Sequence, residues 1–244
     1  MERYNIKVNY LFNSGFLIET ENYLLVFDYY LDSVDGGQND IANGVITEKE
    51  LLTNKKILVF ISHGHEDHFN PCVLDWRKKR EDIKYILSSD IEIQDKYQNI
   101  NIVSPYETLD INGVLIKTYG STDAGVSFWL KVDGVNIFHA GDLNWWHWFD
   151  ESEEFNENQE RVFKQEIESI KDNKVDIVFF PVDPRLIESY YLGGEYFIKQ
   201  LSPKILIPMH FGRNYEVIKK FDSKVKNYET KVVEISKRGE EIVL

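Results

Sequence analysis

The 244-residue sequence has little cysteine and no long hydrophobic run. Cys72 is its one cysteine, so the chain forms no intrachain disulfide, which suits a reducing compartment. No window approaches the roughly 20 apolar residues that a membrane-spanning helix needs. The first residues open no apolar run of signal-peptide length. We therefore expect a cytoplasmic protein without a membrane partner.

Positive charge is also scarce. The chain has 28 Lys and Arg residues against 41 Asp and Glu residues, and its formal net charge at pH 7 is −13. Proteins that bind nucleic acids draw much of their affinity from neutralising phosphates. This charge balance therefore argues against a nucleic-acid partner and favours a small-molecule substrate. It leaves open whether the chain forms a homo-oligomer.

The composition is that of a globular α/β protein. Hydrophobic residues make up 43% of the chain and charged residues 28%. Asn-Gly at 112–113 and Asp-Gly at 133–134 predict tight hairpins, because these dipeptides tolerate the positive φ of primed turns. Helices are expected over 70–80 and 90–97, among other segments. Because no linker or repeat divides the chain, we expect one α/β domain over 1–244 with mixed sheets covered by helices.

The residues most informative about chemistry follow a short apolar run that ends at Ile61. Within six residues the chain places three of its six histidines and an aspartate, namely His63, His65, Asp67 and His68. Imidazole nitrogens and carboxylate oxygens are preferred ligands of zinc, manganese and iron. A solvated polar loop is the alternative, but burying so many titratable groups without a metal is costly. The spacing predicts two neighbouring ions, because a loop this short cannot easily direct all four groups to one.

Three segments together resemble a known family. His63-x-His65-x-Asp67-His68 after an apolar strand resembles the signature of the metallo-β-lactamase superfamily. The segment 137–142, which ends in Gly-Asp, and the segment 206–212, which contains Pro-Met-His, resemble two later motifs of that family. The residues of these two motifs are most similar to those of the branch that contains ascorbate-6-phosphate lactonase and related hydrolases.

This resemblance implies a four-layer αββα sandwich with two mixed β-sheets and a pair of divalent ions, Zn²⁺ or Mn²⁺, with iron as a further option. It also implies the ligands: His63 and His65 for the first metal, Asp67, His68 and His210 for the second, and Asp142 as the bridge. Asp28 lies where the family keeps a structural aspartate that braces the metal loop. His139, which precedes the bridging motif, is expected to support the site rather than bind metal.

One ligand of the family pattern is missing. The family usually supplies a further histidine to the first metal from a turn between the later hairpins, and residues 119–128 contain none. Asp123 is the candidate replacement, because carboxylate oxygen serves Mn²⁺ or Zn²⁺, and Ser121 is a weaker one. Asp123 could equally cap the turn through its own backbone. If neither residue binds, the first metal site is weak or absent.

A two-metal centre implies hydrolysis. Such ions lower the pKa of a bound water from 15.7 toward ~7, so we expect a metal-activated hydroxide that attacks a small, anionic ester, lactone or phosphoester. Asp67 and Asp142 are the expected catalytic residues, since Asp67 would orient the hydroxide and Asp142 would bridge the ions. Two alternatives are a phosphodiesterase or nuclease on the same fold, and a non-catalytic metal-binding module with a degenerate first site.

Four further residues are candidates for substrate binding. Trp145 and His147 follow Asp142 in an aromatic segment that forms either a substrate wall or a hydrophobic plug. In this segment, His147 is expected to be a proton donor, an extra metal ligand or a partly buried structural histidine. Arg185 and Arg213 can each bind an anionic group through the guanidinium fork, or form surface ion pairs instead.

Overall fold

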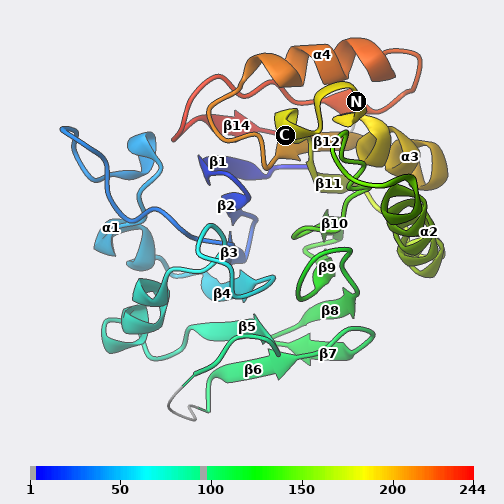
Figure 1. The fold of residues 1–244 in the computed structure, drawn as a ribbon. Helices are drawn as coiled ribbons and strands as arrows, with labels where there is room; N and C mark the ends of the chain where they lie inside the picture. Colours follow the sequence, from blue (N-terminus) through cyan, green and yellow to red (C-terminus); the bar gives the residue numbers. More distant parts are fainter. Residues whose placement is uncertain (1–3, 94–97) are drawn as a thin grey trace.

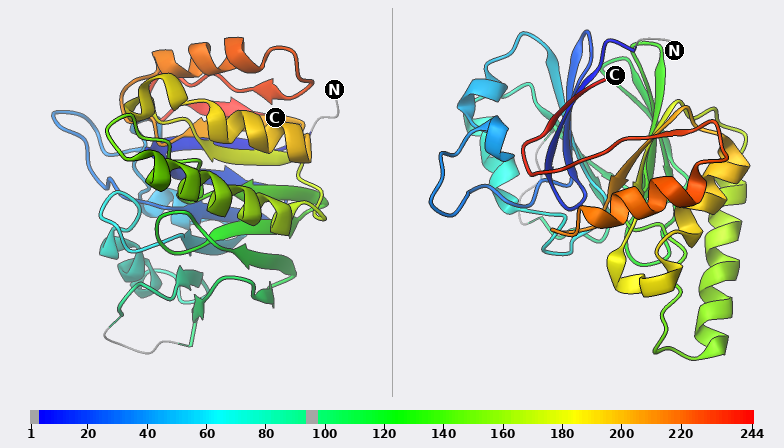
Figure 2. Two further views of the ribbon diagram at one scale, coloured as in Figure 1. Left: turned by 45° about the vertical axis from the view of Figure 1, so that its right-hand side comes forward. Right: turned by 90° about the horizontal axis from the view of Figure 1, so that it is seen from above.

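Two β-sheets form the centre of the computed structural model, which describes residues 4–93 and 98–244. Within these residues each sheet has seven strands, and helices lie on both outer sides of the pair (Figure 1). Seen from above, short helical segments flank one sheet, whereas α2 (Glu153–Ile170) and α3 (Leu192–Leu201) lie outside the other (Figure 2). The fold is therefore the αββα sandwich with two mixed sheets that the family resemblance implied.

Each sheet is antiparallel in one half and parallel in the other. The first sheet has the order β14 (Glu241–Val243), β1 (Lys7–Phe12), β2 (Gly15–Glu19), β3 (Tyr23–Phe27), β4 (Lys56–Ile61), β5 (Lys84–Ser88) and β6 (Ile100–Val103). The second has the order β13 (Lys231–Val232), β12 (Ile205–Met209), β11 (Ile177–Pro181), β10 (Val135–His139), β9 (Ser127–Val132), β8 (Val114–Tyr119) and β7 (Thr108–Ile111). The parallel strands run from β3 to β6 and from β10 to β13.

The central strands are buried on both faces. In β4, Phe60 points into the core between the sheets, whereas its neighbour Val59 packs under the outer helical segments. Phe60 stacks on Phe27 with ring centroids 4.7 Å apart, and Phe128 of the opposite sheet lies 5.3 Å from Phe60. Burial of each such side chain stabilises the fold by roughly 1.5–3 kcal/mol. This double burial explains why the strand reads as a continuous apolar run.

The described helices cover the outer faces. They are α1 (Glu48–Leu51), α2, α3 and α4 (Glu216–Val225), with 3₁₀ turns η1 (Ile41–Asn43), η2 (Pro71–Lys78) and η3 (Pro184–Ser189). In α2, Ser152 caps the first turn by accepting a hydrogen bond from the backbone N–H of Phe155, and the apolar face is buried. None of the helices in the described residues is both long enough and apolar enough to cross a bilayer.

Local sequence signals predicted some of these elements correctly and others only in part. Both hairpins form at 112–113 and 133–134, and all four turn residues have positive φ. The helix expected over 70–80 forms as the 3₁₀ helix η2, capped by Asn70. The prediction of a helix over 90–97 is wrong at its start, because Asp90 is in a turn, Ile91 is in a bend and residues 92–93 are irregular; residues 94–97 lie outside the described residues.

Candidate metal centre

The chemistry-bearing residues gather where parallel strands of the two sheets end. Asp28 follows β3 and the 63–68 loop follows β4, while Asp142, Asp183 and His210 follow β10, β11 and β12. The carboxyl ends of parallel strands lie at one edge of a sheet. Backbone hydrogen bonds join the two edges, from His210 N–H to the Asn13 carbonyl and from Val126 N–H to the Ser62 carbonyl. The fold thereby brings distant chain segments into one rim.

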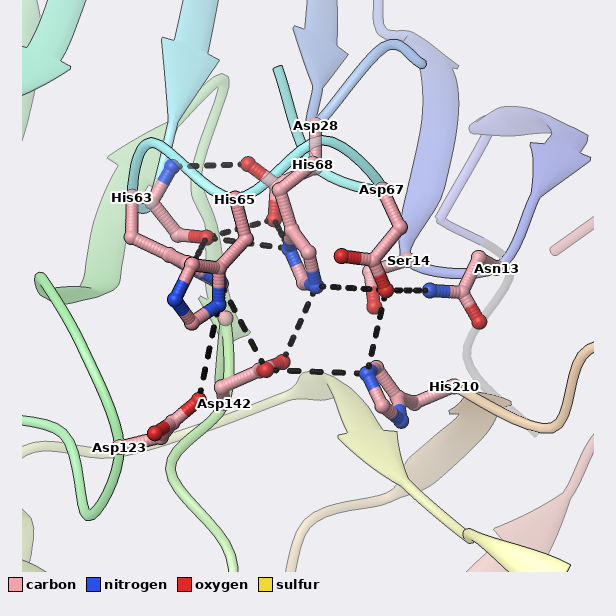
Figure 3. A network of polar contacts seen from close by, with 12 residues as sticks. Asn13, Ser14, Asp28, His63, His65, Asp67, His68, Asp123, Asp142 and His210 are labelled. Carbon is pink, nitrogen blue, oxygen red and sulfur yellow. Dashed lines mark hydrogen bonds and ion pairs between the residues drawn. The ribbon is translucent and has the colours of Figure 1, made fainter. Parts of the chain in front are cut away.

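Two groups of possible ligand atoms meet at this rim (Figure 3). One group consists of His63, His65, Asp123 and Asp142, and the other of Asp67, His68 and His210. Within each group the ligand atoms all lie within 4.8 Å of one another. Asp142 also reaches the second group, because its carboxylate lies 3.3 Å from His68 Nε2 and 3.6 Å from His210 Nε2. It lies between the groups, as the bridging position requires.

The spacing and burial of these atoms suit divalent ions. A tetrahedral ion with ligand bonds of about 2.1 Å separates its ligand atoms by about 3.4 Å. Asp142 Oδ2 lies 3.7 Å from His63 Nε2, and Asp67 Oδ2 lies 3.7 Å from His210 Nε2. The buried atoms His63 Nε2, His68 Nε2 and Asp142 Oδ1 have no hydrogen-bond partner among the described residues. Because buried polar atoms normally have partners, these side chains fit a metal that binds between them.

A hydrogen-bond chain behind the loop fixes two of the imidazoles. His68 Nδ1 lies 2.8 Å from Asp28 Oδ2, and the Ser62 hydroxyl donates to the same oxygen at 2.7 Å. His63 Nδ1 lies 2.9 Å from that hydroxyl oxygen, so its N–H donates to Ser62. With Nδ1 protonated in both rings, Nε2 is left as the free ligand atom. Asp28 thus braces the metal loop, as the resemblance implied.

The third imidazole is held in the same way from the other sheet. His210 Nδ1 lies 3.0 Å from Asp183 Oδ2, and the Arg185 guanidinium holds that carboxylate by donating from Nε and Nη2. On the loop side, the Asn13 amide donates to Asp67 Oδ2 at 2.9 Å. Asp183 therefore sets the orientation of His210, and Asn13 sets that of Asp67.

Electrostatics at the site follow from this packing. Burial raises the pKa of Asp28, but the hydrogen bond and charge of His68 outweigh it and hold that pKa at about 2. Burial lowers the pKa of His68, but Asp142 and Asp28 outweigh it and raise the pKa to about 9. For His63, burial and the neighbouring His68 lower the pKa. Without metal, the cluster is therefore expected to keep a proton on His68 at neutral pH.

Asp123 lies beside His65 at the exposed side of the cluster. Its carboxylate is 3.6 Å from His65 Nδ1, and both side chains are about half exposed, at 49% and 55%. The Ser121 hydroxyl accepts from the Asp123 N–H, so Ser121 caps the turn and the carboxylate stays directed at His65. Gly125 lets this loop approach the metal loop, because a Cβ there would lie 2.0 Å from the Ser62 carbonyl oxygen. The first group is thus the more exposed of the two.

His139 and Trp145 both lie in or against the packed interior and not at the metal centre itself. His139 is buried, with Nε2 2.9 Å from the Ser14 carbonyl, and supports the rim as expected. Trp145 was expected at the substrate wall, but its ring packs against Phe163 and Tyr196 of α2 and α3. The expectation of a substrate wall is wrong for Trp145, because its ring packs on these two helices while Trp146 and Trp148 line the cavity.

The cavity at the metal centre has a volume of about 270 Å³. It is lined by Trp146 and Trp148, whose rings stack 5.9 Å apart, and by Arg185, whose guanidinium lies 5.6 Å from the Trp148 ring centroid. His147 and Arg213 do not line it, which corrects both expectations. His147 is partly buried and is not among the residues that line the cavity, and Arg213 borders a separate groove beside α4.

Sequence reasoning missed the positioning roles of Asn13, Ser62 and Asp183. For Asp183 a signal was present, because it stands two residues after the end of an apolar strand, as Asp28 stands one residue after another. Ser62 stands beside the ligand motif, but its side-chain bonds depend on Asp28, which is 34 residues away. Asn13 reaches Asp67 across 54 residues, and its place in a turn gave no sign of this contact.

Comparison with known proteins gives the same fold. The chain is similar to Igni18, a metallo hydrolase from Ignicoccus hospitalis, with a TM-score of 0.66, 19% identity and 98% of each chain covered. YhfI of Bacillus subtilis, a metallo-beta-lactamase fold protein, has a TM-score of 0.65 at 14% identity, with 97% of this chain and 98% of that chain covered. CmlA of Streptomyces venezuelae, a diiron beta-hydroxylase, has a TM-score of 0.65 at 11% identity, with 100% of this chain and 55% of that chain covered. At these identities the likeness shows the fold alone.

The family match covers the site itself. The model of the beta-lactamase superfamily domain matches residues 7–210, a range that includes both ligand groups. With this match, the sandwich of two mixed sheets and the metal-binding geometry at its rim, the chain belongs to the metallo-β-lactamase superfamily.

Proposed function

We propose that the protein is a metal-dependent hydrolase that acts on a small, anionic ester, lactone or phosphoester. The observation that carries this proposal is the ring of inward-facing, unpartnered ligand atoms, namely His63 Nε2, His68 Nε2 and Asp142 Oδ1. None of these buried atoms makes a hydrogen bond within the described residues, although Asp142 lies in ion-pair range of both imidazoles, at 3.3 Å from His68 Nε2 and 3.7 Å from His63 Nε2. A cavity opens directly beside them, so a substrate can reach the same point.

The residues that would hold the ions form the two ligand groups described above. His63, His65 and Asp123 would hold one ion, and Asp67, His68 and His210 the other, with Asp142 shared between them. The ligand set combines imidazole nitrogens with three carboxylates, which suits Zn²⁺ or Mn²⁺. When bound, divalent ions lower the pKa of water and polarise the oxygen of the bond under attack.

Asp67 is positioned to handle the proton of the attacking water. Its Oδ2 is fixed by the Asn13 amide and lies 3.7 Å from His210 Nε2. Its side chain is 45% exposed and lines the cavity, so its other carboxylate oxygen can accept a hydrogen bond from a water molecule there. We therefore assign Asp67 the role of orienting the water and accepting its proton. Asp142, which is buried, would keep the two ligand groups at a fixed separation.

Arg185 gives the cavity its preference for an anion. Its Nε and Nη2 donate to Asp183, which fixes the plane of the guanidinium, and Nη1 has no partner among the described residues. The side chain is 61% exposed at the cavity. A planar guanidinium with donors to spare recognises carboxylate or phosphate oxygens. The tryptophan pair beside it would exclude water from one side of a bound substrate.

The proposal is tested by metal content and turnover together. Protein purified without chelators is analysed for metals and then assayed with lactones, carboxylic esters, phosphomonoesters and phosphodiesters, each with Zn²⁺ or Mn²⁺. We expect two ions per chain and hydrolysis of at least one small anionic class. Asp67→Asn should abolish most turnover in a folded protein, whereas Asp222→Asn on the exposed face of α4 should not.

Two outcomes would contradict the proposal. A chain that holds both ions and hydrolyses no member of the panel would be a binding module instead. Turnover that survives Asp67→Asn at the wild-type rate would remove Asp67 from the chemistry.

A further inference from the structure

The cavity at the metal centre contains a polar side chain whose hydrogen-bonding capacity is unused. Gln159 of α2 lines this cavity, and its Oε1 is buried. This Oε1 accepts no hydrogen bond from any part of the chain that the structure describes. Buried side-chain oxygen atoms normally have partners. An amide that lacks one and faces a cavity beside a reaction centre is in a position to bind a ligand group.

The position of Gln159 is set by the rest of α2. Phe155 lies one helical turn before Gln159, and both residues line the cavity because residues four apart share a helix face. The Asn156 side chain ties this part of the helix to the aromatic segment, since it accepts from the Trp148 N–H at 2.9 Å and donates to the Trp148 carbonyl at 2.8 Å. Farther along, Phe163 is buried in the core. The amide is therefore held on a rigid element.

A fixed cation lines the same cavity. The Arg185 guanidinium is oriented by Asp183 and lies over the Trp148 ring. The cavity, with a volume of about 270 Å³, suits a small-molecule occupant, and a second hollow of about 300 Å³ shares Asp67, Arg185 and His210 with it. Such an occupant can contact the metal centre, Arg185 and Gln159 at the same time. The cavity thus offers one site for an anion and one for a neutral polar group.

We propose that Gln159 is a specificity-determining residue, which selects substrates that carry a hydroxyl group in addition to the anionic group bound by Arg185. A carboxamide both donates and accepts, so a hydroxyl satisfies either end of it. A plain alkyl anion would leave the Gln159 Oε1 unpaired in the filled cavity, and sites of this kind discriminate against analogues that lack the bonding group. This inference rests on the proposed function, because it places the reacting bond at the metal centre.

The test compares non-hydrolysable ligands that differ only in their hydroxyl groups. The phosphonate arm pairs 2,3-dihydroxypropylphosphonate with propylphosphonate, and the carboxylate arm pairs 2,3-dihydroxypropanoate with propanoate. Dissociation constants are measured by calorimetry on the zinc-loaded protein. Within a pair the anion is identical, so its contacts with metal and with Arg185 cancel. We expect the dihydroxy member to bind at least tenfold more tightly in one arm or both.

Variants then assign the preference to the amide. Gln159→Met keeps the length of the side chain and removes the amide, and should bring the two members of a pair to within about twofold. The matched control is Gln165→Met, on the exposed side of the same helix, which should keep the wild-type preference. Arg185→Met should weaken both members of a pair. Metal content and circular dichroism establish that each variant is folded and loaded.

Three results would overturn the inference: equal affinity for both members in wild type, binding of neither member, or a preference that persists in Gln159→Met. Its failure can be told apart from failure of the hydrolase proposal. Selective binding that depends on Gln159 without any turnover would leave the recognition and remove the hydrolase. Turnover of simple esters that is unchanged in Gln159→Met would support the hydrolase proposal and remove the proposed role of Gln159.

Discussion

Replacing Asp28 by asparagine would test how the protein sets the protonation of its metal ligands. Asp28 is fully buried, and its two carboxylate oxygens accept three hydrogen bonds. Oδ1 accepts from the Ser62 N–H, whereas Oδ2 accepts from the Ser62 hydroxyl and from His68 Nδ1. The φ of Asp28 is 41°, a value that asparagine tolerates well. The variant therefore keeps the backbone and changes the acceptor.

The consequence falls on His68. If the asparagine oxygen keeps the Ser62 N–H, its NH₂ group replaces Oδ2 and faces His68 Nδ1. Two donors then oppose each other, and the ring relieves the conflict by moving its proton to Nε2, the atom that should bind metal. Loss of such a supporting partner typically lowers metal affinity 10–100-fold. At 1.4 kcal/mol for each factor of ten, the expected loss is about 1.4–2.8 kcal/mol.

The assay is a competition titration of the metal-free protein with Zn²⁺ against a chromogenic chelator. Asp176→Asn is the matched control, because Asp176 is a buried, hydrogen-bonded acid just before β11 and lies outside both ligand groups. It should reduce stability without changing zinc affinity. A folded Asp28→Asn protein that binds zinc as tightly as wild type would refute the reasoning.

Three further predictions follow from neighbouring features. Asp123→Ala should weaken the binding of one of the two ions and leave that of the second unchanged, whereas Asp123→His should tighten zinc binding at the same site. Equilibrium dialysis with elemental analysis measures both affinities, and unchanged binding in both variants would contradict the prediction. Gly125→Ala should lower the free energy of unfolding by about 1–3 kcal/mol, because its φ is +68° and its Cβ would meet the Ser62 carbonyl; an unchanged urea midpoint would contradict this. The pKa of His68 is raised from 6.5 to about 9, so this residue stabilises the metal-free protein fully below about pH 6.5, and the effect is lost as the pH rises through 9. Urea unfolding in chelator should therefore show stability falling between these values, and a flat profile would count against it.

Features encoded by neighbouring residues were predictable from the sequence. The two hairpins depend on dipeptides that tolerate positive φ, and both formed where expected. The 63–68 loop and the motifs around Asp142 and His210 indicated which segments would converge, because each stands at the end of an apolar strand. The structure places all of them at one rim.

Features that depend on distant packing were not predictable. The hydrogen bond from Asn13 to Asp67 joins residues that are far apart in the chain. Which tryptophan of the 145–148 segment reaches the cavity depends on how α2 and α3 pack against that segment. The sequence therefore predicted Trp145 at the cavity, whereas Trp146 and Trp148 line it. The form of η2 also depends on context, since the capping signal is the same for a 3₁₀ helix and an α-helix.

The central claim is that these clustered side chains form a two-metal centre. Crystals of protein loaded with Zn²⁺ or Mn²⁺, with anomalous data collected at the absorption edge of the metal, test this most directly. We expect two anomalous peaks roughly 3.5–4 Å apart, one among His63, His65 and Asp142 and one among Asp67, His68 and His210. A map from metal-loaded crystals with no peak between these residues would contradict the account.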